Sequence, residues 1–341
     1  MPASALRDAV RRLARRESLS TAESAAAFRA VMSGDGTPAL IAALLAALRV
    51  KGETAGEIAG AALALRDAVT VMEAPDATAL VDTCGTGGGA VGTFNISTAA
   101  ALVAAGAGAR IAKHGNRSFT TKCGSADVLE ALGVAIDIPV ERMAGVLEEA
   151  GIVFMFAPTM HPAMRHVGPV RRELGIETVM NMVGPLANPA RAGRQVVGAS
   201  DVTRAELMAG ALATLGTVHS LVVHGEPGMD EVSPMGRTAV VEIRGPSVTR
   251  WTIDPASFGF APAAADELKG GGPAENASVI EAVLGGRGTA GATAAVLLNA
   301  AAAIYVAGLE KTLGGALEAA RGAIASGAAR GALDRLRRAT R

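Results

Sequence analysis

The sequence has few cysteines and no net charge, and each shortage excludes a class of protein. Its 341 residues include only two cysteines, Cys84 and Cys123, which excludes a disulfide framework and favours a reducing cytoplasm. Lysine plus arginine and aspartate plus glutamate both number 32, so no overall positive charge is available for a nucleic acid backbone or an anionic membrane. A bound polyanion must therefore be held by a local group of residues.

The chain also lacks a typical export signal or membrane span. The arginine-rich residues 1–17 contain Asp8 and Glu17, which suit a surface helix better than an acid-poor transit peptide. The longest apolar stretch, residues 290–310, consists mostly of alanine and predicts a core helix rather than a membrane span. These features favour a cytoplasmic protein.

The first seventy residues carry the start signals of several short helices. Ser20 with Glu23 and Thr54 with Glu57 have the spacing of a capping box, in which side chain and backbone bond each other at a helix start. Thr37-Pro38 places a capping residue before a proline at the first helical position. The segment therefore predicts a small all-helical domain over residues 1–74.

From residue 75 onward, short apolar runs alternate with helix-like segments. The strand candidates are residues 78–82, 109–113, 152–157, 195–200 and 219–225. Such alternation indicates crossover units around a mostly parallel sheet surrounded by helices, with ligands at the carboxyl ends of the strands. The length suits about two domains of ~150 residues each. The sequence therefore predicts an α/β fold, with a second, larger α/β domain over residues 75–341.

The segment "VDTCGTGGGAVGTFNIST", residues 81–98, is unusually rich in glycine. Glycines leave backbone N–H groups accessible, and the helix that follows turns its positive dipole end toward the same space. The segment has neither the lysine of a P-loop nor the spacing of a dinucleotide loop. It predicts a receptor for phosphate or diphosphate, with a glycine-rich turn and capping hydroxyls as the alternative.

The next strand leads into "KHGNRS", residues 113–118, which would lie beside the glycine loop in a parallel sheet. Lys113 and Arg117 would then supply local positive charge, and Asn116 would supply directional hydrogen bonds. A solvated strand end for Lys113 and a packed loop position for His114 are the alternatives.

Two later segments add charged residues. Asp230 and Glu231 stand together in a loop, as magnesium near a phosphate requires, although adjacent acids are also common surface residues. Arg165, Arg171 and Arg172 cannot share one helical stripe, so one is expected to face a substrate carboxylate while the others are solvated.

Six segments together resemble the anthranilate phosphoribosyltransferase family, and the likeness extends over residues 34–277. The segments are "GTGG", "FNIST", "KHGNR", "GSADVLEALG", "HPAMRHVGPVRRELGIETVMNMVGPLANP" and "VVHGEPGMDEVS". The resemblance implies a helical domain that carries a homodimer interface, includes helices from about 162–190, and is joined by hinges to the α/β domain. It also implies Mg²⁺, 5-phosphoribosyl 1-diphosphate and anthranilate as ligands, with neither nucleic acid nor a membrane as a partner.

The resemblance also assigns residues. Those matching the family's phosphoribosyl diphosphate contacts are Gly85, Gly88, Gly89, Thr93, Asn95, Ile96, Ser97, Thr98, Lys113, His114, Gly115, Asn116, Arg117, Ser118, Phe119, Thr120, Thr121 and Ser125. Those matching the anthranilate contacts are Gly85, Asn116 and Arg171. Those matching the magnesium ligands are Ser97, Asp230 and Glu231, and those resembling the walls of an access channel are His161, Gly184 and Pro185. No general base is expected, and Lys113 would act electrostatically.

The chain departs from the family pattern at three positions. Gly89 stands where an aspartate is usual, and Phe119 and Cys123 stand where small hydroxyl residues are common. These departures affect the expected magnesium binding and substrate affinity more than the reaction class. A pyrimidine nucleoside phosphorylase of the same architecture and a catalytically idle binding relative are the alternatives.

Overall fold

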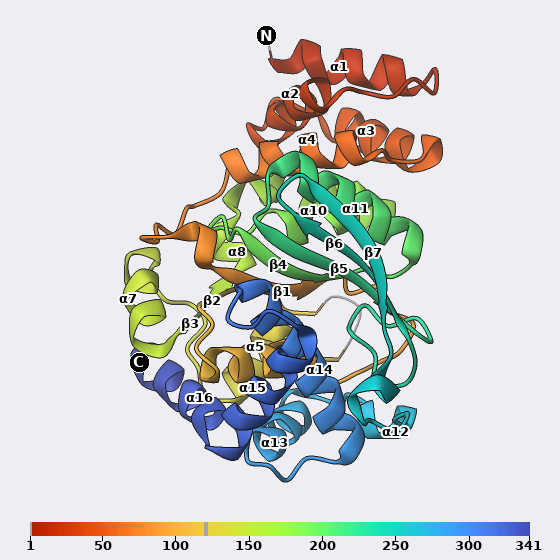
Figure 1. Cartoon of the computed structure of the whole chain (residues 1–341). Helices are drawn as coiled ribbons and strands as arrows, with labels where there is room; N and C mark the ends of the chain where they lie inside the picture. Colours follow the sequence, from red (N-terminus) through yellow and green to blue (C-terminus); the bar gives the residue numbers. More distant parts are fainter. Residues whose placement is uncertain (1, 119–121) are drawn as a thin grey trace.

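The computed structural model describes residues 2–118 and 122–341, and it begins with four short helices (Figure 1). The helices are α1 (Pro2–Leu13), α2 (Thr21–Met32), α3 (Pro38–Lys51) and α4 (Ala55–Asp67). The predicted capping boxes are confirmed at α2, where Ser20 and Glu23 bond each other's backbone, and at α4, where Thr54 and Glu57 do so. Local sequence therefore determines where these helices begin.

The larger part of the chain is built on one seven-stranded sheet with the order β3-β2-β1-β4-β5-β6-β7. The strands are β1 (Val81–Gly85), β2 (Ile111–Gly115), β3 (Ile152–Phe156), β4 (Arg194–Gly198), β5 (His219–Gly225), β6 (Thr238–Arg244) and β7 (Ser247–Ile253). The pairs among β1 to β5 are parallel, as expected from the sequence, and β6 and β7 add an antiparallel edge that the sequence analysis did not predict. The mostly parallel α/β fold is thus confirmed.

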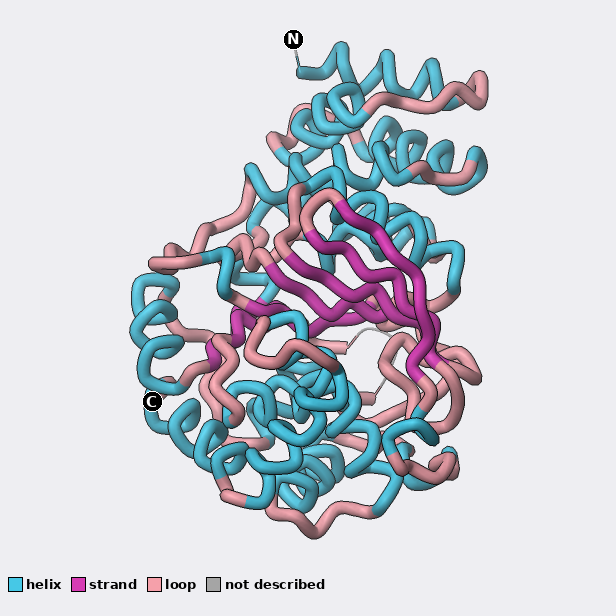
Figure 2. Tube along the Cα trace, viewed as in Figure 1, coloured by secondary structure: helices cyan, strands magenta, loops and turns pink. Residues whose placement is uncertain are grey.

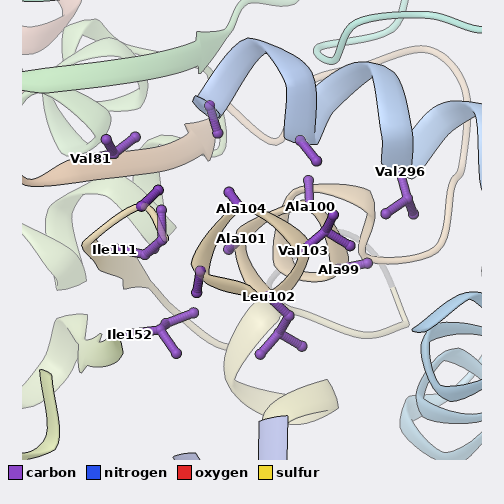
Figure 3. Close-up of a cluster of buried hydrophobic side chains, with 14 of the residues drawn as sticks. Val81, Ala99, Ala100, Ala101, Leu102, Val103, Ala104, Ile111, Ile152 and Val296 are labelled. Atoms are coloured by element: carbon purple, nitrogen blue, oxygen red, sulfur yellow. The ribbon is translucent and has the colours of Figure 1, made fainter. Parts of the chain in front are cut away.

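One face of the sheet is covered by an alanine-rich helical layer (Figure 2). Its helices are α5 (Ile96–Gly106), α6 (Ser125–Ala131), α7 (Val140–Ala150), α13 (Pro273–Leu284), α14 (Ala290–Ala307), α15 (Leu313–Ala325) and α16 (Ala328–Ala339). Figure 3 shows Val81, Ile111 and Ile152 of three strands around α5, with Val296 of α14 on its other side. Small alanine side chains let these helices lie close to the strands.

The opposite face of the sheet packs against α11 (Val202–Leu215), which in turn packs against α4 of the N-terminal helices. Two short helices from the middle of the chain, α9 (Gly168–Leu174) and α10 (Val179–Val183), pack against α3 and α4. This packing agrees with the expectation that residues 162–190 join the helical part. The division into domains at residue 74 stays a prediction.

The remaining short elements connect these layers. They are α8 (Ala157–Met160), α12 (Ala265–Leu268), and the 3₁₀ turns η1 (Ala77–Ala79), η2 (Pro162–His166), η3 (Gly184–Leu186) and η4 (Pro255–Phe258). Among the described residues, α14 alone is long and apolar enough to cross a membrane by length and composition. Because 78% of its apolar window is buried inside the protein, α14 is a core helix, as expected.

Candidate active site

The predicted ligand-binding segments meet at the carboxyl edge of the sheet. The glycine loop follows β1, the "KHGNRS" segment forms the end of β2 and the turn after it, and the loop with Asp230 and Glu231 follows β5. Because β1, β2 and β5 all run parallel within one sheet, their carboxyl ends lie at one edge (Figure 1). The fold thus brings together three segments that are far apart in the sequence.

The glycine loop lies directly against Asp230. The N–H of Gly87 donates a hydrogen bond of 2.8 Å to Asp230 Oδ2. A Cβ atom at Gly85 would lie 2.8 Å from the same oxygen, and one at Gly89 would lie 2.6 Å from Oδ1. At Gly198 a Cβ atom would lie 1.6 Å from the Asp230 carbonyl oxygen. These glycines therefore admit the acidic loop itself, in addition to any ligand.

The start of α5 is held by side chains from other segments. Asn95, the residue before the helix, makes no side-chain capping bond. Instead its Oδ1 accepts from Asn276 Nδ2 at 2.9 Å, and its Nδ2 donates to the carbonyl of Cys123 at 3.2 Å. Thr93 forms an isolated bridge with Lys269. The end of the glycine loop is thus fixed by tertiary contacts of Asn95 rather than by a local capping bond.

Lys113 is buried beneath the glycine loop. Only 2% of it is exposed, so the alternative of a solvated strand end is wrong. Its ammonium donates to the carbonyl of Thr83 and lies 3.4 Å from Ser97 Oγ. Burial lowers the pKa of Lys113, and the nearby Asp82 carboxylate opposes that shift. Among the residues that the structure describes, no carboxylate lies within ion-pair distance of this ammonium.

The predicted magnesium ligands lie beside this lysine. Burial, reinforced by the neighbouring Asp230, raises the pKa of Glu231 to about 8, and Lys113 opposes the rise. The backbone of Ser97 also opposes the rise in the pKa of Glu231. A small cavity bordered by Thr83, Ser97 and Glu231 has room for roughly one water molecule.

This donor set fits magnesium bound jointly with a phosphate. Asp230 and Glu231 provide two carboxylates, and no group of three or more acidic, histidine or cysteine side chains suited to a metal occurs within the described ranges. Magnesium usually keeps several waters and binds through one or two carboxylates plus substrate phosphates. The residues therefore suit an ion that arrives with a phosphorylated substrate.

His114 near the carboxyl end of β2 is half-buried and pairs with the buried His161. Their Nε2 atoms are 3.1 Å apart and their ring centroids 4.8 Å apart. Burial lowers the pKa of both rings, to about 4 for His161, so both are neutral at pH 7 and one N–H is shared between them. The fold thus joins a predicted sugar-diphosphate contact to a predicted channel residue.

Arg117 points away from Lys113 and its charge is already paired. It forms ion pairs with Asp127 and Glu130 of α6 and stacks over the ring of Phe156. Any direct contribution of Arg117 to anion binding would require these pairs to open.

The other predicted residues of this segment line its turn. Ser125 Oγ donates to the carbonyl of Asn116, and a Cβ atom at Gly115 would lie 2.1 Å from that hydroxyl. The N–H of Ser118 donates to Asp127. The predicted contacts at Phe119, Thr120 and Thr121 lie outside the described residues.

Arg171 is the partly buried member of the three predicted arginines. It lies half-buried on α9, whereas the side chains of Arg165 and Arg172 are exposed. Its Nη2 lies 3.4 Å from Asn181 Oδ1, and in the described part of the chain it has no carboxylate partner. Burial lowers its pKa. A half-buried guanidinium without a carboxylate partner suits a substrate carboxylate.

The predicted channel residues Gly184 and Pro185 lie in η3, whose chain runs beside β1 and β4. The carbonyl of Pro185 accepts a hydrogen bond of 2.9 Å from Gln195 Nε2 of β4. It also accepts a longer contact from Cys84 Sγ. These contacts hold η3 at the carboxyl edge of the sheet.

The sequence analysis missed residues that support this edge from below and beside it. Glu177 and Ser200 lie against Gly88, and Arg204 binds both of them. Asp82 and Asn188 bond each other between β1 and η3. The sequence signal that could have identified this pair was Asp82, a charged residue inside the apolar run that precedes the glycine loop.

The fold and this edge define an α/β protein with groups suited to a phosphate and a divalent metal, and comparison with known proteins identifies its family. The chain belongs to the glycosyl transferase family, whose sequence models match residues 7–69 as its helical bundle domain and residues 77–330 as its α/β domain. The resemblance described above is confirmed by full-length relatives. The anthranilate phosphoribosyltransferases of Rubrobacter xylanophilus and of Roseiflexus sp. are 49% and 48% identical, covering 98% and 97% of both chains.

Solved structures give the same result. The anthranilate phosphoribosyltransferase of Thermus thermophilus superposes with a TM-score of 0.92 at 43% identity, covering 98% of this chain and 99% of that one. The Saccharomyces cerevisiae enzyme in complex with PRPP and Mg has a TM-score of 0.90 at 27% identity, covering 99% and 98%. These likenesses support the transferase over the nucleoside phosphorylase alternative.

Proposed function

We propose that this chain transfers the 5-phosphoribosyl group from 5-phosphoribosyl 1-diphosphate to the amine of anthranilate. The products are N-(5-phosphoribosyl)anthranilate and diphosphate, and the reaction belongs to tryptophan biosynthesis. The observation that carries the proposal is the meeting of the glycine loop, Lys113 and the pair Asp230 and Glu231 at one edge of the sheet. It is supported by relatives of that name over nearly the full chain.

The glycine loop is suited to anionic oxygens. The Gly87 N–H already binds one, Oδ2 of Asp230, and the start of α5 lies next in the chain. A diphosphate at this point would meet backbone N–H donors and the positive end of the helix dipole. Gly85, Gly88, Gly89, Thr93 and residues 95–98 are accordingly proposed as its contacts, together with residues 113–118 and Ser125.

Catalysis is proposed to be mainly electrostatic. When the C1–oxygen bond of the ribose breaks, negative charge grows on the leaving diphosphate, and Lys113 lies below the loop where that charge develops. Ser97, Asp230 and Glu231 would hold Mg²⁺, which supplies Lewis-acid stabilisation of the phosphate oxygens. The low dielectric around Lys113 strengthens its action on that charge.

Anthranilate is proposed to bind through Arg171, with Gly85 and Asn116 beside it. The Arg171 guanidinium is half-buried and meets only the neutral Asn181 oxygen within the described chain, so it can pair with the substrate carboxylate. The aromatic amine is unprotonated at neutral pH and needs no strong base before attack. Positioning of the amine against C1 therefore supplies the rest of the rate.

A fluorescence assay for N-(5-phosphoribosyl)anthranilate tests the proposal. The protein, anthranilate, the sugar diphosphate and Mg²⁺ should together give product, and omission of either substrate should abolish it. Incubation with uridine or thymidine and inorganic phosphate tests the phosphorylase alternative and should release no base. Absence of product with anthranilate would leave a binding relative as the better description.

Assembly and location stay predictions. The helical part with α9 and α10 is proposed to carry a homodimer interface, and a chain with only two cysteines, Cys84 and Cys123, is proposed to be cytoplasmic. Sedimentation of the purified protein would measure its oligomeric state.

A further inference from the structure

The sheet is open between β1 and β2 at the edge where the ligands are proposed to bind. β2 pairs with β3 over five register positions, and β1 pairs with β4 over five. Between β1 and β2 the register contains one position, Val81 with Ile111. The strands are each five residues long, so most of the backbone groups that face each other across this gap are not bonded to each other.

The next position in a closed ladder would pair Thr83 with Lys113. In a parallel ladder this position would join Thr83 N to the carbonyl of Ala112, and His114 N to the carbonyl of Thr83. Three of these four backbone groups bond a side chain. The Ala112 carbonyl accepts from Asn188 Nδ2 at 2.9 Å, His114 N donates to Asp82 Oδ1 at 3.1 Å, and the Thr83 carbonyl accepts from the Lys113 ammonium.

These three side chains, Asp82, Lys113 and Asn188, form a polar wedge. All are buried, with 0%, 2% and 1% exposure. Asn188 Nδ2 also donates to Asp82 Oδ2 at 2.7 Å, and Asn188 Oδ1 accepts from the N–H of Ala190. Because buried polar groups are costly unless they are bonded, the wedge replaces the missing ladder at little cost.

We propose that Asp82 and Asn188 are positioning residues that keep β1 and β2 apart, so that the Lys113 ammonium lies between them under the glycine loop. In a closed ladder the Thr83 carbonyl would accept from His114 N, and the ammonium would lose this bond. Held by the wedge, Lys113 bonds neutral oxygens and keeps its charge for an incoming anion. This inference rests on the proposed function, in which that anion is the leaving diphosphate.

A residue exchange tests the pairing. Asp82→Asn leaves one acceptor oxygen where His114 N and Asn188 need two, and Asn188→Asp places a second carboxylate against the first. Each change should lower kcat/KM for the sugar diphosphate at least tenfold, measured well below the unfolding temperature. The double variant restores a donor facing an acceptor between positions 82 and 188, although the Ala112 carbonyl loses its donor, and should recover at least threefold of this loss. Recovery of less than twofold would overturn the pairing.

A double-mutant cycle tests whether the wedge acts through the lysine. If it does, Asp82→Asn should cost less than twofold in a Lys113→Met background, although it costs at least tenfold in the native background. Equal losses in the two backgrounds would show that the wedge is only structural. Where turnover is too slow, calorimetric binding of 5-phosphoribosyl 1-diphosphate with Mg²⁺ provides the same cycle.

Glu242→Gln is the matched control, because Glu242 is also a buried, fully bonded carboxylate but lies at the opposite edge of the sheet. It should lower the unfolding temperature and leave kcat/KM unchanged within twofold. If the unmodified protein forms no product from anthranilate, the proposed function fails. The calorimetric cycle then still decides whether the wedge serves anion binding.

Discussion

Both edges of the central sheet contain buried charged side chains, but only at the amino edge is the charge fully hydrogen-bonded. At the amino edge, Glu242 accepts hydrogen bonds from Arg244 Nε at 2.7 Å, Trp251 Nε1 at 2.8 Å, His219 Nε2 at 2.9 Å and the Tyr305 hydroxyl at 3.1 Å. These include the only tryptophan and the only tyrosine of the chain. The donors lower the pKa of Glu242, although burial opposes them.

At the carboxyl edge, the corresponding groups lack such partners. Burial and Asp230 together raise the pKa of Glu231, and Lys113 bonds only neutral oxygens among the described residues. A fully bonded charge stabilises the fold, whereas an incompletely bonded one is available to a ligand. The comparison teaches that one sheet uses the same kinds of residue for stability at one edge and for binding at the other.

The largest expected effect comes from removing the acids of the carboxyl edge. Asp230→Asn combined with Glu231→Gln should lower kcat/KM about a thousandfold, since metal-assisted charge stabilisation contributes several kcal/mol. Titration with Mg²⁺ in the product assay measures it. Glu148 and Glu149 are exposed and adjacent to each other in the sequence, so changing both to glutamine provides a matched control. An unchanged magnesium titration would make Asp230 and Glu231 ordinary surface charges.

Removal of the half-buried arginine should have a smaller and more selective effect. Arg171→Ala should raise the KM for anthranilate about 10- to 100-fold, as expected for loss of a charge-assisted hydrogen bond. The KM for 5-phosphoribosyl 1-diphosphate should change little. Arg172→Ala, at the exposed neighbour, should alter neither constant. Equal increases for the two substrates would remove the role assigned to Arg171.

The raised pKa of Glu231 predicts a pH dependence of metal binding. Because magnesium needs the ionised carboxylate, its affinity should rise about tenfold per pH unit up to the pKa of about 8 and then level off. In the metal-free protein, the neutral carboxyl stabilises the fold fully below about pH 4.5, and this contribution is lost as the pH rises through about 8. Unfolding temperatures from pH 6 to 9, with and without Mg²⁺, measure both effects. A constant difference across that range would contradict the assignment.

The smallest effect on activity is expected at the amino edge. Glu242→Gln should destabilise the fold by about 1–3 kcal/mol, because it removes the charge from hydrogen bonds to Arg244 and His219. Chemical denaturation measures this loss, and kcat/KM should stay the same. A large loss of activity without loss of stability would show that the two edges are not separate in function.

Several features of this protein were predictable because they depend on neighbouring residues. The helix starts at Ser20 and Thr54 follow from side chains that bond their own backbone three residues away. The parallel arrangement of β1 to β5 follows from alternating strand-like and helix-like segments, and this order placed Lys113 and Asp230 at one edge. The meeting of these segments at one edge was therefore predictable from the sequence, and their role in binding stays a prediction.

The side-chain and backbone contacts between these segments were not predictable in this way. The sequence alone determined the helix starts, the parallel sheet and the residues at its carboxyl edge, because short-range hydrogen bonds and periodic apolar residues specify them. Only the tertiary structure decided that Gly89 lies against Asp230, that Arg117 is paired with α6, and that Asn188 bonds the Ala112 carbonyl of β2. Each of these depends on residues far apart in the chain, and only close packing shows which groups remain without a partner.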